Sequence, residues 1–131
     1  MLSYHDTLFV IAGKWRFEPS DNVLRSTNNG INWSNTGLSW VSTFPPRYNH
    51  SSVVYQDLMW IIGGATEPNG SSSASIKTND CWYSADGKYW YEAPQLDSLP
   101  PMAGHSSVVF DDKIWVMNEN TVWCGEAVSI E

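Results

Sequence analysis

Hydrophobic residues occur along the chain in short runs that are separated by clusters of Asn, Asp, Gly, Ser and Pro. The runs are rich in β-branched and aromatic residues, which favour strands, and helical spacing is absent over any useful length. In the clearest unit we expect strands at residues 50–55, 58–64, 79–84 and 89–92. Gln56-Asp57 and residues 85–88 predict tight turns, and the polar segment 66–78 predicts a long mobile loop. The pattern therefore predicts an all-β chain.

The sequence repeats itself. Residues 45–55 recur without a gap at residues 100–110, and residues 4–13 match residues 55–64. A second motif, Ser26 to Trp33, is similar to Ser84 to Trp90. We therefore predict a single domain of three related units at about residues 1–40, 45–95 and 100–131. The third is truncated, and residues 127–130 are a candidate remnant of its last strand.

Four-stranded units of about 50 residues are typical of β-propeller blades. Pro45-Pro46-Arg47-x-x-His50-Ser-Ser-Val-Val, a following strand that ends in Gly63-Gly64, and then Trp82 and Trp90 together resemble a kelch repeat. The stretch Ser26-x-Asn28-x-Gly30-x-x-Trp33 is similar to the Asp-box of sialidase-type propellers, with Asn in place of Asp. The resemblance implies a kelch-like β-propeller, a fold that hosts many activities.

Three blades cannot close a ring, because propellers need about four to eight. An open stack would leave an apolar face uncovered at each end. Two chains of three blades make six, and two-fold symmetry closes such a ring without filament growth. We therefore expect a homodimer that forms one six-bladed ring. The competing interpretation is that the chain is part of a longer propeller.

The candidate ligand-binding residues come from two kinds of loop. The kelch resemblance implies that loops entering the first strand of a blade, and loops following its second strand, line one rim of the channel. Aromatic rings and planar donors there suit a carboxylate, a sugar or a protein. The predicted set is Trp15, Arg16, Arg47, Tyr48, Asn49, His50 and His105.

Each member of this set has a structural alternative. His50 and His105 occupy equivalent places, and recurrence favours packing or capping over ligand contact. No carboxylate recurs beside them, so we predict no metal site. Arg47 is replaced by Met102 in the third unit, which favours a special role. The alternative is an ion pair with an acidic neighbour at the surface.

Other motifs favour structural roles. Six tryptophans recur by repeat and are expected to pack between blades, whereas Trp15 and Trp40 do not recur and suit a surface function. Asn28 and Asp86 are expected to bond their own backbone in the Asp-box-like turns. Cys81 and Cys124 are predicted to be free thiols, because the repeat points both the same way around the ring.

Composition narrows the function classes. The 131 residues include 7 Lys+Arg and 14 Asp+Glu, giving a net charge of −7, which argues against nucleic acid and anionic membranes as partners. The apolar runs are too short for a membrane span, and the N-terminus does not resemble a signal peptide, so we expect a cytoplasmic protein.

The function predicted from the sequence is a non-catalytic binding module without a cofactor. Two alternatives remain. One is a sugar-processing enzyme, either a kelch-type sugar isomerase using Arg47, His50 and His105 or a sialidase-like enzyme. The other is a propeller fragment without a function.

Overall fold

The computed structural model describes residues 1–36, 43–67, 74–94 and 98–125. These residues form three antiparallel sheets, none of which closes on itself, and they contain no α-helix. The predicted all-β class is confirmed at this level. None of the described segments forms a helix that is long and apolar enough to cross a membrane. The candidate remnant strand at 127–130 and Trp40 lie outside the described residues.

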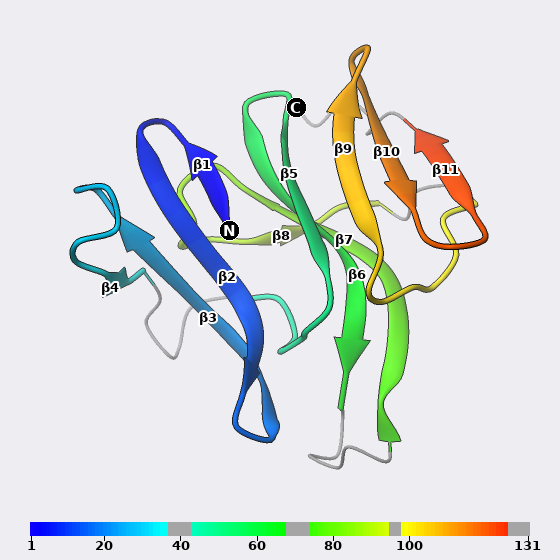
Figure 1. The fold of residues 1–131 in the computed structure, drawn as a ribbon, viewed down its shortest axis with the longest axis horizontal. Coiled ribbons are helices and arrows are strands. Elements are labelled where there is room, and N and C mark those ends of the chain that lie inside the picture. Colours follow the sequence, from blue (N-terminus) through cyan, green and yellow to red (C-terminus); the bar gives the residue numbers. More distant parts are fainter. Residues whose placement is uncertain (37–42, 68–73, 95–97, 126–131) are drawn as a thin grey trace.

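The strands follow one another in chain order within each sheet (Figure 1). The first sheet contains β1 (Leu2–Tyr4), β2 (Thr7–Trp15), β3 (Glu18–Ser26) and β4 (Ser34–Asn35). The second sheet contains β5 (Ser51–Tyr55), β6 (Leu58–Thr66), β7 (Ile76–Ser84) and β8 (Tyr91–Glu92). The third sheet contains β9 (Ser106–Phe110), β10 (Lys113–Met117) and β11 (Val122–Gly125).

Each sheet begins with a two-residue hairpin. Gln56 and Asp57 have φ angles of 51° and 58°, and the equivalent pairs His5-Asp6 and Asp111-Asp112 also have positive φ. Positive φ at both central residues matches the right-handed twist of the flanking strands, and polar residues tolerate it better than β-branched ones. The predicted turn at Gln56-Asp57 is therefore confirmed.

The predicted loop at residues 66–78 was too long. Ile76 and Lys77 already belong to β7, where they pair with Thr66 and Ala65. The local sequence is polar because this end of the hairpin extends beyond the core, and pairing across the hairpin holds it in strand conformation. The central part, residues 68–73, lies outside the described residues.

A β-bulge interrupts the second strand of the first and second sheets. The register shifts between Ile11 and Gly13 in β2, and between Ile62 and Gly64 in β6. In β6 the two glycines have φ of 59° and 106°, and a Cβ on Gly63 would lie 2.9 Å from the carbonyl oxygen of Met102. Glycine is required there because the next segment of chain approaches the bulge so closely.

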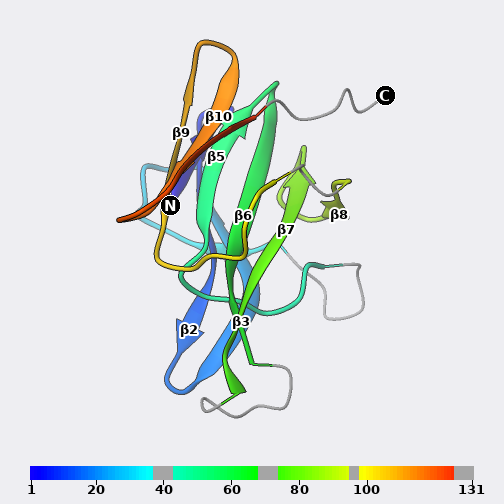
Figure 2. The same ribbon diagram turned by 90° about the vertical axis from the view of Figure 1, so that its right-hand side faces the viewer.

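The three sheets follow one another in sequence order, from left to right in Figure 1 and overlapping along the view in Figure 2, and buried clusters fill the spaces between their faces. Their first strands are neighbours, since β5 contacts both β1 and β9. One buried cluster, which includes Phe9, Ile61 and Trp90, fills the space between the first and second sheets. Another, which includes Trp60, Ile62 and Ile114, fills the space between the second and third. The second sheet is therefore covered on both faces.

Tyrosine hydroxyls link consecutive sheets at the hairpin end. Tyr4 donates to the backbone oxygen of Asp57 at 2.7 Å, and Tyr55 donates to that of Asp112 at 2.9 Å. The two bonds are equivalent by repeat. Phe110 occupies the same place in the third sheet and has no hydroxyl to donate.

The turns that begin at Ser26 and Ser84 are closed by bonds to the local backbone, as predicted. Ser84 Oγ accepts from the backbone N–H groups of Asp86 and Gly87 at 3.2 and 2.8 Å, and Asp86 Oδ1 accepts from those of Lys88 and Tyr89. Ser26 and Asn28 make the corresponding bonds in the first sheet. These bonds confirm the expected local role of Asn28 and Asp86.

Candidate functional site

The chain segment before β5 is held by both neighbouring sheets. The backbone N–H of Arg47 donates to the carbonyl of Ser20, and its own carbonyl accepts from the N–H of Gly13 at the β2 bulge. Tyr48 exchanges two backbone hydrogen bonds with Ala65 in β6. Met102 repeats this arrangement one unit later, bonding Thr78 and Gly64. The position is therefore a structural junction in both units.

The side chain of Arg47 is completely buried. Its two terminal nitrogens donate to the two carboxylate oxygens of Asp80, each at 2.8 Å, and Nη1 also donates to the carbonyl of Gly63. Burial opposes ionisation of Asp80, but hydrogen bonds from Arg47 and Trp82 outweigh it and lower the pKa of Asp80 to about 2. The acidic neighbour in the alternative interpretation is Asp80, but the expected surface location is wrong, because Arg47 is buried.

The histidines contact carbonyls of the preceding sheet. His105 Nε2 lies 2.9 Å from the carbonyl oxygen of Ile62, to which it donates, and His50 bonds the backbone of Ile11. Burial lowers the pKa of both rings, and for His50 the nearby Arg47 charge helps to bring the pKa to about 4. The recurrence of histidine thus has a structural explanation, since Ile11 and Ile62 precede the two equivalent bulges.

Tyr48 belongs to a polar cluster with Lys14 and Glu67. Glu67 Oε1 accepts from Lys14 Nζ at 2.8 Å and from the hydroxyl of Tyr48 at 3.0 Å. The hydrogen bond from Lys14 is the main cause of the lowered pKa of Glu67. The side chain of Glu67 is fully buried, and its second oxygen, Oε2, has no hydrogen-bond partner among the described residues.

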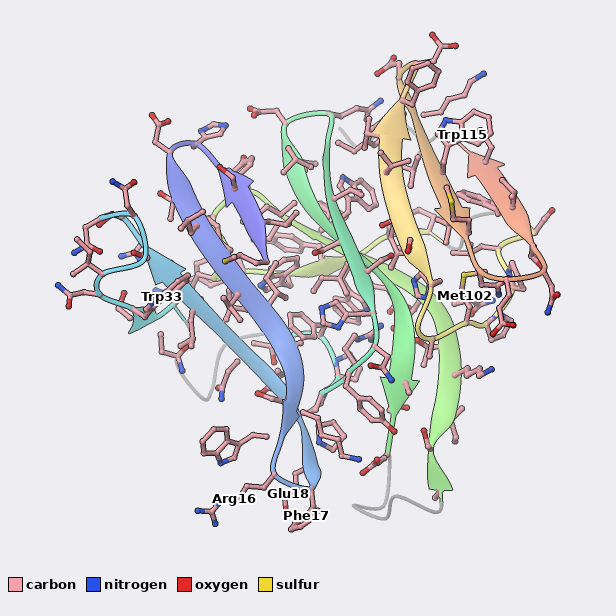
Figure 3. The ribbon with its side chains drawn as sticks, viewed as in Figure 1. Arg16, Phe17, Glu18, Trp33, Met102 and Trp115 are labelled. Carbon is pink, nitrogen blue, oxygen red and sulfur yellow. The ribbon has the colours of Figure 1, made fainter. Side chains whose placement is uncertain are left out.

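The remaining predicted residues lie at the surface. Trp15 and Arg16 are exposed near the tip of the β2–β3 hairpin, where Figure 3 shows Arg16 and Phe17 pointing away from the sheets. Asn49 is exposed, and its backbone oxygen accepts from Gly104. The predicted residues therefore do not meet at one site, since Arg47 bonds Asp80, Tyr48 bonds Glu67, and Trp15 and Arg16 are exposed at the hairpin tip.

A cleft of about 450 Å³ opens between the first and second sheets beside Arg47, Glu67 and Asp80. We call it the Glu67 cleft. Its apolar walls include Pro19, Pro45 and Pro46. Sequence reasoning missed Glu67 and Asp80. Asp80 had a detectable signal, because the third unit replaces Arg47 by Met102 and Asp80 by Thr121, so both members of the charged pair change together.

The outer faces of the first and third sheets are uncovered and apolar. On the third sheet Phe110 is 70% exposed and Val122 67%, whereas the equivalent Tyr55 and Cys81 of the second sheet are each 2% exposed. On the first sheet the exposed residues include Val10, Leu24 and Trp33, and Figure 3 shows Trp33 at the outer edge beside β4. These two faces form a second candidate binding site, because their apolar residues can pack against another β-sheet.

Within the described ranges, no group of three or more His, Cys, Asp or Glu side chains is arranged to hold a metal ion. Cys81 is buried and Cys124 exposed, and both are free. Burial raises the pKa of the Cys81 thiol to about 12, so it stays protonated and unreactive.

Fold and contacts define an all-β protein of three related antiparallel sheets. No protein-family model matches the chain. It is similar to the leucine-zipper-like transcriptional regulator 1 homolog of Drosophila melanogaster, with 32% identity over 124 residues. The match covers 88% of this chain and 12% of that protein, so the chain spans only a small part of its relative's length.

Proposed function

We propose that the chain is a non-catalytic binding module made of three kelch-like β-propeller blades, and that two copies close into one six-bladed ring. The order of strands within each sheet and the adjacency of β1, β5 and β9 support blades arranged around an axis. The recurring contacts between sheets support equal placement of successive blades, because the same tyrosine and histidine bonds occur at both junctions.

One observation carries the proposal: the uncovered face of the third sheet is the repeat equivalent of the buried face of the second. Phe110, Met117 and Val122 occupy the places of Tyr55, Ile62 and Cys81, which the third sheet covers. An apolar face of this kind is unfavourable in water at roughly 25 cal/mol for each Å². We therefore expect a further sheet to pack against this face.

A second copy is the occupant that the repeat specifies. The outer face of the first sheet carries Leu8, Val10 and Leu24, the equivalents of Met59, Ile61 and Trp82, which pack on the preceding sheet. The first sheet of one copy can therefore dock on the third sheet of another as the third docks on the second. Two such junctions close the assembly with two-fold symmetry.

A non-catalytic role is favoured by the state of the residues that could have performed chemistry. Arg47 is paired with Asp80, and His50 and His105 contact backbone of the preceding sheet. The same residues would have been the candidates in a sugar isomerase. Their structural contacts leave binding, at a cleft or at a sheet face, as the function that the geometry supports best.

Introducing a charge into the uncovered face tests the proposal. Phe110→Glu should convert a dimer into a monomer in light scattering, because a carboxylate would be buried without a partner at the junction. Phe17→Glu is the matched control, since Phe17 is 85% exposed at a hairpin tip far from that face. Equal masses for both variants and the wild type would contradict the proposed junction.

A further inference from the structure

The distal half of β2 has an open edge. β1 pairs only with residues 7–9 of β2, which continues beyond it to the hairpin tip (Figure 1). In the second sheet the equivalent stretch of β6 has a partner, because Tyr48 exchanges two backbone hydrogen bonds with Ala65. Lys14 is the repeat equivalent of Ala65, and among the described residues only β3 pairs with its backbone. An open strand edge can accept an extended segment of another chain.

The backbone at this edge has the shape that holds such a segment in the second sheet. Ala12 and Gly13 have φ of 56° and 110°. The equivalent Gly63 and Gly64 have φ of 59° and 106°, so the two bulges share one conformation. A Cβ on Gly64 would lie 2.9 Å from Cβ of His50, in the segment before β5, whereas a Cβ on Gly13 would meet nothing within 4 Å. The space that this segment fills in the second sheet is therefore open in the first.

A pocket of about 180 Å³ lies beside the open edge, and we call it the β2-edge pocket. Its lining includes Ala12, Ser20 and Asn22, none of which is buried. By strand register, their equivalents in the second sheet are Gly63, Thr78 and Asp80. The side chain of Arg47 donates to all three of those residues. The β2-edge pocket is therefore the counterpart, in the first sheet, of the place that Arg47 fills in the second.

The pocket offers acceptors for an arginine side chain, which carries five donors in a fixed plane. The acceptors are the Ala12 carbonyl, the Ser20 hydroxyl and the Asn22 amide oxygen. Asn22 Oδ1 also accepts from Asn35 at 3.4 Å, and a carbonyl oxygen has room for a second donor. Because Asn22 stands where the second sheet has the carboxylate of Asp80, we expect an arginine to be held less tightly here than Arg47 is.

The surroundings of the pocket favour a positive charge. The indole of Trp15, which is 73% exposed, is part of the lining, and an aromatic face attracts a guanidinium. Lys14 is the one cation among the described residues that line the pocket, and its ion pair with Glu67 compensates its charge. The chain as a whole has a net charge of −7. Charge and acceptors together therefore select an arginine over an acidic or apolar side chain.

The third sheet of a second copy would leave this edge accessible in the proposed ring. Its β10–β11 hairpin ends with the pair Met117 and Val122, the equivalents of Ile62 and Cys81. In the second sheet that pair lies just before the bulge, so the third sheet stops short of the level of the bulge. The open edge of β2 lies beyond its own bulge.

We propose that the open edge of β2 and the β2-edge pocket bind an extended segment of a partner protein, with an arginine in the pocket and the next residue paired with the backbone of Lys14. Residues 45–50, Pro-Pro-Arg-Tyr-Asn-His, set the pattern, because they make these contacts with the second sheet. The two prolines hold such a segment extended before it binds. The inference rests on the proposed binding function and names a partner chemistry for it.

The test is a fluorescence-anisotropy titration with two labelled peptides. One has the sequence of residues 44–50, and the other has norleucine in place of its arginine. The arginine peptide should bind saturably, and the norleucine peptide should bind about tenfold more weakly or less, because it lacks the donors and the charge. Equal binding of the two peptides, or no saturable binding of the arginine peptide, would overturn the proposal.

Variants of Asn22 place the binding at the pocket. Asn22→Asp copies Asp80 and should tighten the arginine peptide about fivefold or more, with little change for the norleucine peptide. Asn22→Lys should weaken the arginine peptide about tenfold or more, because like charges repel. Asn32→Lys is the matched control, exposed in the same sheet but outside the pocket, and should change binding by less than about twofold. An Asn22→Asp variant that binds no more tightly would contradict the site, since a gain in affinity does not arise from misfolding.

Light scattering on the same samples separates this inference from the proposed ring. A single-chain mass with saturable binding of the arginine peptide would contradict the ring and support the pocket. A dimer that does not bind the peptide would support the ring and overturn the pocket.

Discussion

The covered and uncovered faces of the same repeat behave as two different surfaces. Trp60 of the second sheet is completely buried, whereas its equivalent Trp115 in the third sheet is only partly buried. Both indoles donate to the backbone oxygen at the end of the preceding strand, at 3.1 and 3.0 Å. The local structure is therefore the same, and the difference comes entirely from the next sheet. The exposure of a residue in this protein therefore depends on whether another sheet packs against its own. The sequence of a single repeat does not determine it.

The largest expected effect is a difference in stability between variants that truncate these two tryptophans. Trp60→Ala should lower the free energy of unfolding by about 3–5 kcal/mol at any protein concentration, because it opens a cavity in a filled core. Trp115→Ala should cost less than about 2 kcal/mol in dilute solution, where its outer face contacts water. Urea denaturation at two protein concentrations would measure both. Equal losses for the two variants would contradict the difference in burial.

Arg47 and Met102 give a second contrast between equivalent positions. Arg47→Met should cost about 2–4 kcal/mol, because it leaves the carboxylate of Asp80 without its cation. Asp80 is partly exposed, which reduces the cost below that of a fully buried charge. The double variant Arg47→Met with Asp80→Thr copies the third unit and should recover more than half of the loss. A double variant as unstable as the single one would exclude charge pairing as the cause.

His50 predicts a pH dependence of stability. Its folded pKa of about 4 lies below its ordinary value of 6.5, so the unfolded chain binds the proton more tightly. Its contribution is therefore present above pH 6.5 and is lost as the pH falls towards 4, by up to about 3 kcal/mol. Burial of the ring is the main structural reason, and the positive charge of the nearby Arg47 adds to it.

The His50 effect can be measured by thermal unfolding between pH 4 and 7. His50→Gln should flatten the profile over this interval. His5→Gln is the control, because His5 is exposed and its bond to Asp57 is at the surface. A profile that stays as steep in His50→Gln as in the control would assign the dependence to other groups.

The smallest expected effect concerns the tyrosine links. Tyr55→Phe should cost about 1 kcal/mol, because it removes the bond to the carbonyl of Asp112. Phe110→Tyr makes the opposite change at the proposed junction, where the new hydroxyl would meet the Asp6 carbonyl of a second copy. With about 1 kcal/mol at each of the two junctions, it should tighten the dimer about thirtyfold. Sedimentation would detect the change, and weaker association in Phe110→Tyr would contradict the register of docking.

The strands and tight turns could be predicted from the sequence because they depend on local patterns. Gln56-Asp57 between two apolar runs is sufficient to place a hairpin. The ends of β6 and β7 could not be placed, because the pairing of Thr66 with Ile76 spans a polar segment that has no strand pattern of its own.

The site was harder to predict than the fold. The burial of Arg47 depends on Asp80, which lies on another strand. The sequence indicates this pair only through the joint replacement of Arg47 by Met102 and of Asp80 by Thr121 in the third unit. Glu67 had no comparable signal. Its burial arises from packing between two sheets, and a single glutamate at the end of a strand ordinarily indicates a solvated position.

The central claim is that two chains close one ring, and the mass in solution tests it most directly. Light scattering after size exclusion, at two concentrations of the unmodified chain, should give the mass of two chains. The mass should fall towards that of one chain only on strong dilution. A stable single-chain mass at both concentrations would contradict the claim, and would mean that the uncovered faces of the first and third sheets are met by something other than a second copy.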